Sequence, residues 1–454
     1  MHLVFLNQYY PPDAAPTGVM LEDLANGMVN RGHEVTVLCA SGGYSTNGRN
    51  VEGPRLEELP KHQNTETRKP RILRIASTKF GRKTFAGKLL DYGSFYLGVT
   101  WRLATMRPRP DRIVALTTPP YLSVMARVAS KLRGADHAHW VMDLYPDVME
   151  AHEMIPKDGR RHRFLSRLTR LGLGGKRCAA VVTLGPDMAE RVSRYLGPSK
   201  LRSPETPDHR NTETPLVSWV PLWRAWDEEP ENHDEASREL RRKRGWRDGE
   251  MIVMYSGNMG LGHRFGEILA AARRFSGMSH RDGEGRPRNH PQPAAARTRE
   301  GKVRFVFFGG GKRRDEVSEF LSGHPGCAVE LHDYAPADGL RTHLRSADVH
   351  LVSLDAGWTG TMIPSKLQGI FAAARPVIFI GSGSSSIAGW VRESGGGWIV
   401  QPGDVDGLMT ALGEARNGRT RTLRGRAALA YANAHFDMKQ NVVRVAELFE
   451  GIIT

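Results

Sequence analysis

Short apolar runs alternate along the chain with segments whose apolar residues recur at helical spacing. The first forty residues show the pattern: His2–Leu6 and Glu34–Ala40 are apolar runs, and apolar side chains recur every three or four positions between 20 and 28. The same alternation continues through 112–116, 121–132, 137–143, 179–184 and a helical segment that begins near Pro186. Strands that alternate with helices predict a parallel sheet covered on both faces.

A second cycle of the same pattern begins at Met251. Apolar runs at 251–256, 303–308 and 376–380 are separated by segments of helical spacing. Polar, Pro-rich stretches at 197–215 and 276–301 interrupt the pattern, and we interpret the first as a linker and the second as a disordered surface insertion. The fold class that this predicts is α/β, with two parallel-sheet domains in series that face a cleft.

Length and charge narrow the class of protein. The 454 residues exceed what one core supports, and 40% hydrophobic content is that of an ordinary globular protein. The net charge of +15 is uneven, because 68–112 carries a local +10 and 157–177 a local +7. A basic surface indicates an anionic partner: nucleic acid, anionic lipid or a phosphorylated substrate.

The three cysteines and the amino-terminal residues bear on the compartment. Cys39, Cys178 and Cys327 lie far apart without a CxxC spacing, which argues against a disulfide framework or a structural zinc site. The first residues lack the pattern of a signal peptide, and no apolar stretch of membrane-spanning length follows. We therefore expect a cytoplasmic protein whose contact with a membrane is peripheral.

A glycine-rich loop, GNMGLG at 257–262, follows the apolar run 251–256 and precedes a helical segment. Glycines there let backbone N–H groups approach a phosphate. The order of the glycines differs from the dinucleotide-binding fingerprint, and a tight turn is the alternative. A P-loop at 81–89 is excluded by its spacing and by Leu89 at the position of the magnesium ligand.

A second candidate anion site lies in 357–376. Its glycine-containing loop leads into a predicted helix that starts with Pro364, Ser365 and Lys366, which can add a hydroxyl and a cation to free backbone donors. The alternative is a well-capped helix with a surface lysine.

Carboxylates and histidines of the first half offer two further candidates. Asp143 and Asp147 follow the apolar run 137–143, where the end of a parallel strand presents side chains to a ligand, although both could simply cap turns. His137 and His139 share one strand face, but a third metal ligand at suitable spacing is missing. We interpret them as structural histidines and expect no metal site.

The two basic windows interleave cations with large apolar residues at helical spacing. Basic amphipathic segments are typical of an anionic bilayer surface. RNA binding is the alternative, but the sequence lacks RNP1-like and zinc-knuckle patterns. Core aromatics beneath a solvated basic face would explain less well why the charge gathers in one half. We therefore expect a membrane surface as partner and no nucleic acid.

Five motifs, taken in order, resemble glycosyltransferase family 4, and in particular its bacterial subgroup of colanic-acid-type exopolysaccharide synthesis. They are QYYPPDAAPTG at 8–18, RGHEVTVL at 31–38, DLYPD at 143–147, YSGNMGLGHRF at 255–265 and IPSKLQGIFAAARPVI at 363–378. The resemblance implies a GT-B fold of two Rossmann-like domains. The first, 1–220, would hold the acceptor, the second, 221–425, the nucleotide sugar, and helices in 426–454 would cross back to the first.

The resemblance also implies roles for single residues. Catalytic roles fall to Asp143, Arg264 and Lys366, with Asp143 the better candidate near the acceptor because Met142 replaces the histidine of relatives. The residues implied to bind the nucleotide sugar are Gly18, Gly257, Asn258, Gly260, Gly360, Thr361 and Ser365. Two glutamates common in the family stand here as Thr361 and Gly369, which leaves ribose recognition unassigned, and Asp355 is the nearest replacement carboxylate.

The function expected from residues and resemblance together is metal-free glycosyl transfer with retention, without a cofactor. The donor would be a nucleoside diphosphate sugar and the acceptor a polyprenyl-diphosphate-linked glycan at the inner face of the plasma membrane. Two alternatives remain: a nucleotide-sugar epimerase of the same fold, or a non-catalytic donor-binding subunit of a polysaccharide assembly complex.

Overall fold

The computed structural model describes residues 1–13, 15–41, 69–78, 80, 85–197, 216–223, 233–276, 302–336 and 339–451. The expected linker at 197–215 and the expected insertion at 276–301 lie, apart from their first residues, outside this part of the chain. The chain divides into two compact units. The first comprises Met1–Pro221, Gly360–Met362 and Lys439–Thr454, and the second comprises Leu222–Thr359 and Ile363–Met438.

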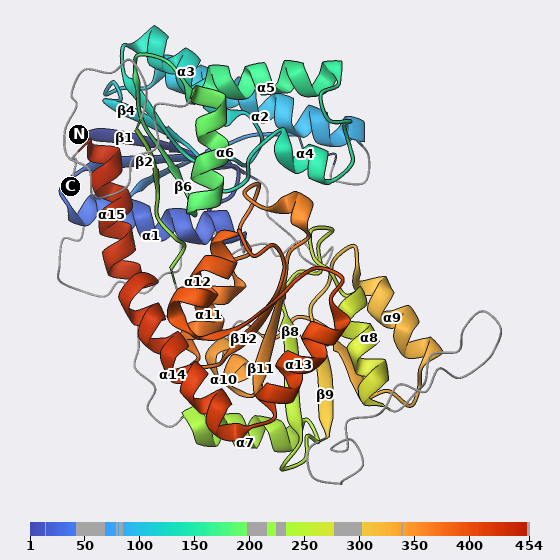
Figure 1. The fold of residues 1–454 in the computed structure, drawn as a ribbon. Helices are drawn as coiled ribbons and strands as arrows, with labels where there is room; N and C mark the ends of the chain where they lie inside the picture. Colours follow the sequence, from blue (N-terminus) through green and yellow to red (C-terminus); the bar gives the residue numbers. More distant parts are fainter. Residues whose placement is uncertain are drawn as a thin grey trace. The chain divides into compact units, whose positions relative to one another are not determined.

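The first unit contains a seven-stranded, wholly parallel sheet in the order β3-β2-β1-β4-β5-β6-β7 (Figure 1). Its strands are β1 (His2–Leu6), β2 (Glu34–Ala40), β3 (Arg71–Ile75), β4 (Arg112–Ala115), β5 (Asp136–Trp140), β6 (Cys178–Thr183) and β7 (Leu216–Trp219). Its helices are α1 (Pro16–Asn30), α2 (Phe85–Thr105), α3 (Leu122–Arg133), α4 (Asp147–Ala151), α5 (Arg160–Leu173), α6 (Pro186–Leu196) and α15 (Met438–Glu450).

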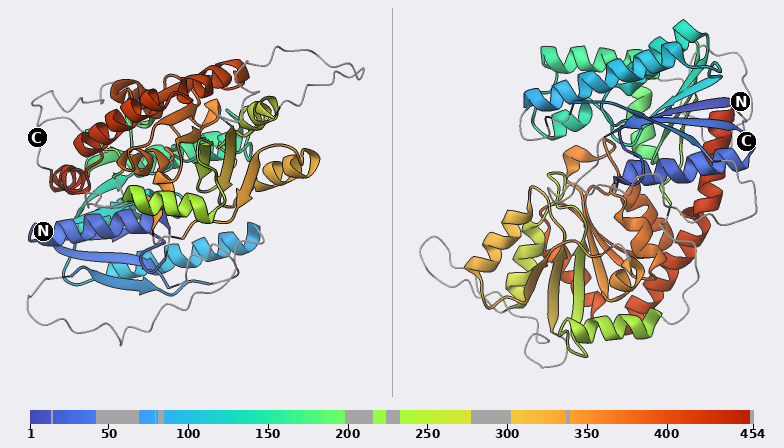
Figure 2. Two further views of the ribbon diagram at one scale, coloured as in Figure 1. Left: turned by 90° about the horizontal axis from the view of Figure 1, so that it is seen from below. Right: turned by 180° about the vertical axis from the view of Figure 1, so that it is seen from behind.

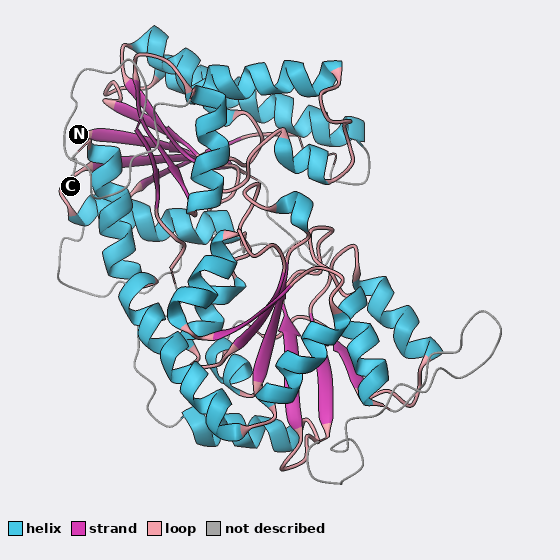
Figure 3. Cartoon of the chain, viewed as in Figure 1, coloured by secondary structure: helices cyan, strands magenta, loops and turns pink. Residues whose placement is uncertain are grey.

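The second unit contains a six-stranded parallel sheet in the order β10-β9-β8-β11-β12-β13. Figure 3 draws the strands in magenta and the helices that cover them in cyan. Its strands are β8 (Met251–Ser256), β9 (Val303–Phe308), β10 (Val329–His332), β11 (Val349–Ser353), β12 (Val377–Ile380) and β13 (Gly397–Val400). Its helices are α7 (His233–Lys243), α8 (Gly266–Phe275), α9 (Arg314–Gly323), α10 (Leu340–Arg345), η2 (Ala356–Trp358, 3-10), α11 (Lys366–Ala372), α12 (Ser386–Ser394), α13 (Val405–Ala415) and α14 (Gly418–His435).

Both faces of each sheet are covered, as the near-continuous apolar strands predict. In the first unit, Val4 and Leu6 of β1 pack with α2 and α3 on one face, while Phe5 on the opposite face meets Phe449 of α15 at 6.4 Å between ring centroids. In the second, alternate residues of β8 divide between two clusters in the same way. The α/β prediction of two Rossmann-like parallel sheets is confirmed.

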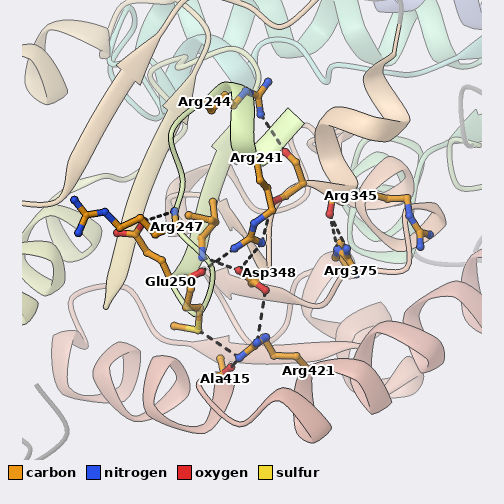
Figure 4. Close-up of polar contacts among 12 residues, drawn as sticks. Arg241, Arg244, Arg247, Glu250, Arg345, Asp348, Arg375, Ala415 and Arg421 are labelled. Atoms are coloured by element: carbon orange, nitrogen blue, oxygen red, sulfur yellow. Dashed lines mark hydrogen bonds and ion pairs between the residues drawn. The ribbon is translucent and has the colours of Figure 1, made fainter. Parts of the chain in front are cut away.

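An ion-pair network around Asp348 holds the amino-terminal ends of β8 and β11 together (Figure 4). Its carboxylate accepts from Arg241 of α7 at 2.9 Å and from the Ile252 amide at 2.8 Å, and it pairs with Arg421 of α14 at 3.5 Å. Because Arg421 takes part, α14 is fixed to the second sheet.

The carboxyl-terminal helices divide between the units. The sequence-based boundary at 425/426 falls inside α14, whereas the structure changes unit between Met438 and Lys439. The physical reason is that α14 packs on α11, α12 and β13, while α15 packs in the first unit through Phe449 and through Glu450, which pairs with Arg31 at 2.6 Å. Among the described residues, none of the helices has the length and apolar character needed to cross a membrane.

Candidate functional site

The strand order of the second sheet reverses between β8 and β11. Parallel α/β sheets bind ligands at the carboxyl ends of strands where the order reverses, because the connecting loops diverge there. The loop after β8 is the predicted glycine loop, 257–262, and the segment after β11 leads through η2 to Lys366. The two candidate anion loops of this unit therefore follow neighbouring strands.

A third glycine-rich loop completes this edge of the sheet. Gly309–Gly311 follows β9, and a side chain at Gly309 would place its Cβ only 2.1 Å from the carbonyl oxygen of Gly257. Backbone hydrogen bonds join the loops, from the Gly257 amide to Phe308 at 2.9 Å and from the Met259 amide to Gly310 at 2.7 Å. Sequence reasoning missed this loop, although three glycines directly after a buried strand were the signal that could have found it.

Lys366 lies over the first glycine loop. Its Nζ donates to the Tyr255 hydroxyl at 2.7 Å, to the Asn258 carbonyl at 3.2 Å and to Nε2 of His263 at 3.1 Å. At Gly257 a Cβ atom would lie 2.6 Å from Cε of Lys366, so glycine is needed there for the lysine to pass. The helix α11 begins at Lys366, not at the predicted Pro364, and Ser365 is its exposed N-cap without a side-chain capping bond.

Lys366 is a cation among uncharged partners. The Nδ1–H of His263 donates to the Ser353 carbonyl at 2.7 Å, so Nε2 is left to accept from Lys366. Burial, followed by the charge of Lys366, lowers the pKa of His263 to about 3. Burial lowers the pKa of Lys366 itself to about 7. An anion bound beside Lys366 would restore its charged form, which is the electrostatic requirement for a diphosphate site.

Arg264 has a different environment from the one expected for a diphosphate ligand. Its guanidinium pairs with Glu267 at 2.6 Å and with Asp355 at 2.8 Å. Burial would raise the pKa of Glu267, but the hydrogen bonds from Arg264 and from the Gly403 amide hold it below its ordinary value. Arg264 therefore links α8 to the segment after β11 through these two ion pairs. Its catalytic role stays a prediction.

The remaining predicted binding residues divide between the units. Asn258 is exposed, and Gly260 lies beside it in the same loop. Gly360 and Thr361 belong to the first unit: Gly360 packs on the backbone of Asp187, and the Thr361 carbonyl accepts from the Leu144 amide at 2.8 Å. The structure therefore gathers Gly257, Asn258, Gly260, Ser365 and Lys366 in the second unit, and places Gly360 and Thr361 in the first.

Gly18 and Asp143 occupy the corresponding edge of the first sheet, where the order reverses between β1 and β4. A Cβ at Gly18 would lie 3.1 Å from the Tyr9 backbone, so α1 packs directly on the loop after β1. Asp143 follows β5 and lines a cavity of about 30 Å³ together with Thr117 and Tyr145. Burial raises the pKa of Asp143 to about 6, close enough to neutrality for proton exchange with a hydroxyl.

Asp147, the second carboxylate of the same loop, has a structural role. It accepts from Arg191 at 2.9 Å and from the Tyr195 hydroxyl at 2.6 Å, and both partners belong to α6. These bonds use both carboxylate oxygens and fix the start of α4. Only Asp143 of the two is therefore left as a candidate for contact with an acceptor.

Comparisons with known proteins agree with this arrangement. Residues 17–202 match the family model of the glycosyl transferase 4-like domain, and residues 292–416 match that of glycosyl transferases group 1. A putative colanic acid biosynthesis glycosyl transferase, WcaI of Escherichia coli, is 23% identical over 96% of both chains.

Solved structures share the fold at low identity. WaaG, a glycosyltransferase involved in lipopolysaccharide biosynthesis, has a TM-score of 0.62 at 15% identity and covers 98% of this chain and 99% of its own. HepE of Anabaena in complex with UDP-glucose has a TM-score of 0.62 at 13% identity, with 98% of each chain covered. With its two parallel-sheet units and matches to both domain models, the chain belongs to the glycosyltransferases of the GT-B fold, with a family-4-like first domain.

Proposed function

We propose that this glycosyltransferase transfers a hexose-type unit from a nucleoside diphosphate sugar to a polyprenyl-diphosphate-linked acceptor in exopolysaccharide synthesis. The observation that carries the donor assignment is the environment of Lys366. A half-buried lysine whose hydrogen-bond partners are all uncharged lies beside glycine loops that leave backbone close to the surface. Its charge is unbalanced until an anion binds.

Lys366 would act most strongly on the leaving group. Breaking the glycosidic bond to the diphosphate leaves extra negative charge on the departing oxygen, and a fixed cation with backbone N–H groups stabilises that charge. Tyr255, His263 and the Asn258 carbonyl keep the ammonium group in place, so little reorganisation is needed when the charge develops. With this lysine and the backbone N–H groups at the diphosphate, we expect no metal ion to be needed there. We also expect the transfer to proceed with retention, as the family resemblance implies.

The UDP and UDP-glucose complexes of the structural neighbour HepE support a nucleotide sugar as the donor class. The direct test is product formation from a panel of radiolabelled nucleotide sugars and a polyprenyl-diphosphate-linked acceptor. Lys366→Met should reduce turnover by about 100-fold or more, the scale of losing one transition-state donor. The control is Lys243→Met on α7, an exposed lysine that lies 3.9 Å from Glu239. Equal turnover by both variants would overturn the site.

The acceptor class rests on an exposed surface of the first unit. Large apolar side chains stand in solvent on α2, α3 and α5: Leu97 is 75% exposed, Trp101 73% and Leu132 70%. Five exposed arginines accompany them on α5, namely Arg160, Arg161, Arg163, Arg167 and Arg170. The helices α2 and α5 both pack on α3, and Figure 2 shows the three helices as neighbours in the first unit.

Such a surface suits an anionic bilayer, because apolar side chains enter the headgroup region while arginines bind lipid phosphates. This surface supports our proposal that the enzyme works at the inner face of the plasma membrane, next to a lipid-linked acceptor. We expect binding to vesicles that contain anionic lipid, and weaker binding to zwitterionic vesicles. The double variant Arg163→Glu, Arg167→Glu should lose most of that binding, whereas Arg242→Glu on α7 should not. Binding that ignores lipid charge at low salt would contradict this assignment.

A further inference from the structure

Two histidines and a cysteine meet on one face of the first sheet. His137 and His139 lie two residues apart on β5, so their side chains point the same way. Cys178 begins β6 and is the register partner of His137. One possible ligand atom from each residue lies within 4.8 Å of the others, and all three residues are buried. We call these three residues the His-His-Cys cluster.

Polar atoms in this cluster lack the partners that buried groups normally have. Within the described part of the chain, neither ring nitrogen of His139, which is 1% exposed, has a hydrogen-bond partner, and Nε2 of His137 has none either. Nδ1 of His137 lies 3.2 Å from the Ser130 hydroxyl. The Gly172 backbone favours the protonated form of His139, and the Gly174 backbone that of His137, although neither contact has the geometry of a full hydrogen bond. Burying such atoms unpaired is unfavourable, so a ligand that pairs with them would be stabilised here.

The electrostatic surroundings keep both imidazoles neutral. Burial lowers the pKa of His137 to about 4 and holds that of His139 well below its ordinary value, and the nearby Arg127 guanidinium adds to both shifts. Burial raises the pKa of the Cys178 thiol, against the opposing effects of Arg127 and Arg112. Asp136 is the acidic neighbour that acts on His137 and Cys178. Neutral imidazoles offer lone pairs, while the thiol must lose its proton to become a ligand.

We propose that His137, His139 and Cys178 form a binding site for a thiophilic metal ion, and that Zn²⁺ is the ion it holds. Zinc accepts imidazole nitrogen and thiolate sulfur in tetrahedral geometry. In that geometry ligand atoms lie about 3.3–3.6 Å apart, so small rotations of the three side chains would close the present spacing. A water molecule would serve as the fourth ligand, because His139 also lines the cavity of about 30 Å³ beside Asp143, which has room for one water.

Sequence reasoning rejected a metal here because no third ligand followed at a suitable spacing. The third ligand comes instead from the neighbouring strand, 39 residues beyond His139 in the chain. Binding would release the Cys178 proton, since only the thiolate is a strong zinc ligand. The ion would stabilise the pairing of β5 and β6 immediately before the loop that carries Asp143. This role is separate from the donor site and does not depend on the proposed function.

The test is metal content and metal exchange in the intact chain. Protein from zinc-supplemented cultures should contain one zinc per chain by mass spectrometry of the metal, and Co²⁺ in its place should give thiolate-to-cobalt charge-transfer absorption. His139→Gln and Cys178→Ala should each weaken zinc binding by about 100-fold in competition with a chromophoric chelator. The matched control, Cys39→Ser on β2, removes another buried cysteine and should keep full binding.

Folding of each variant is checked by circular dichroism, and the two substitutions of different residues guard against a single unfolded variant. Loss of zinc in both His139→Gln and Cys178→Ala with retained fold establishes the site. A chain that purifies with no stoichiometric zinc and takes up neither zinc nor cobalt overturns the proposal, and so does unchanged affinity in both variants. No sugar donor enters the measurement, so its outcome is independent of glycosyl transfer.

Discussion

Lys366 is the residue on which the donor site depends. Its partner Tyr255 is 111 positions away in the chain, and Tyr255 also donates from its hydroxyl to the Asn258 carbonyl at 2.7 Å. The sequence could predict a cation near a glycine loop, because both occur beside strand ends. It could not predict that Tyr255 and His263 would hold the lysine, since both are buried side chains that lie more than 100 positions before Lys366 in the chain.

The pH dependence of donor binding follows from the lowered pKa of Lys366. In the free protein the ammonium form is largely present below pH 7 and is lost as pH rises through about 7. A bound diphosphate favours the charged form, so affinity should be greatest below pH 7 and weaken by up to tenfold per pH unit above it. Isothermal titration with a nucleotide sugar, whose diphosphate does not titrate in this range, measures the effect.

The Lys366→Met variant serves as the control for that titration, because it has no group to lose the proton and its weak binding should not vary between pH 7 and 9. Proton uptake on binding, seen as a dependence of the heat on buffer, should accompany the wild-type titration at pH 8. Wild-type affinity that stays constant from pH 6.5 to 9 would show that Lys366 does not face the donor.

Gly257 and Gly260, which lie in the same loop, allow a matched pair of substitutions to alanine. The φ of Gly257 is +130°, a backbone conformation that residues other than glycine avoid, and a Cβ would collide with Lys366. Gly257→Ala should lower the free energy of unfolding by about 1–3 kcal/mol and weaken donor binding. At Gly260 the nearest atom to a new Cβ is the flexible Asn258 amide at 3.2 Å, so Gly260→Ala should cost much less. Urea unfolding of both variants gives the comparison, and equal losses would contradict the packing described.

At the scale of elements, the sequence predicted the central strands better than the edges of the sheets. Strands such as β1, β8 and β9 are continuous apolar runs because both of their faces are buried. The edge strand β3 carries arginines and is only partly buried, so its pattern did not stand out. Likewise, the partner of the two histidines on β5 was missed because register between strands is a tertiary property.

The docking of α15 in the first unit depends on a paired carboxylate. Glu450 is bound by Arg31 at 2.6 Å and by His33 at 2.7 Å, and the hydrogen bond from Arg31 is the main cause that lowers its pKa. A carboxylate with a lowered pKa stabilises the fold above its unfolded value of about 4.5, and this contribution is lost as pH falls through the folded value.

Glu450→Gln should therefore lower the free energy of unfolding by about 1–2 kcal/mol at pH 7, and the difference from wild type should shrink below pH 4.5. Glu190→Gln is the matched control, because Glu190 forms an exposed pair with Arg194 within α6 and should change stability by less than about 0.5 kcal/mol. Calorimetry of the three proteins at pH 7 and pH 4 checks both statements. An equal change in the free energy of unfolding for the two variants would show that the ion pairs of Glu450 contribute no more stability than one exposed ion pair.

For the whole molecule, the structure shows where part of the uneven positive charge of the sequence lies. The window 157–177 is fully described and forms α5 with its exposed arginines, whereas part of the window 68–112 lies outside the described residues. The two α/β units, their parallel sheets and the glycosyltransferase assignment follow from alternation and motif order. The identity of the sugar does not, because neither the alternation nor the order of the motifs is specific for one sugar.

Isothermal titration of nucleoside diphosphates into the wild-type enzyme, Lys366→Met and Lys243→Met measures whether Lys366 binds the diphosphate of the donor. One nucleoside diphosphate should bind the wild type and Lys243→Met with the same affinity, whereas Lys366→Met should bind it at least tenfold more weakly, a loss of about 1.4 kcal/mol or more. Equal affinity in all three proteins would show that the diphosphate binds elsewhere and would contradict the donor site built on the second sheet.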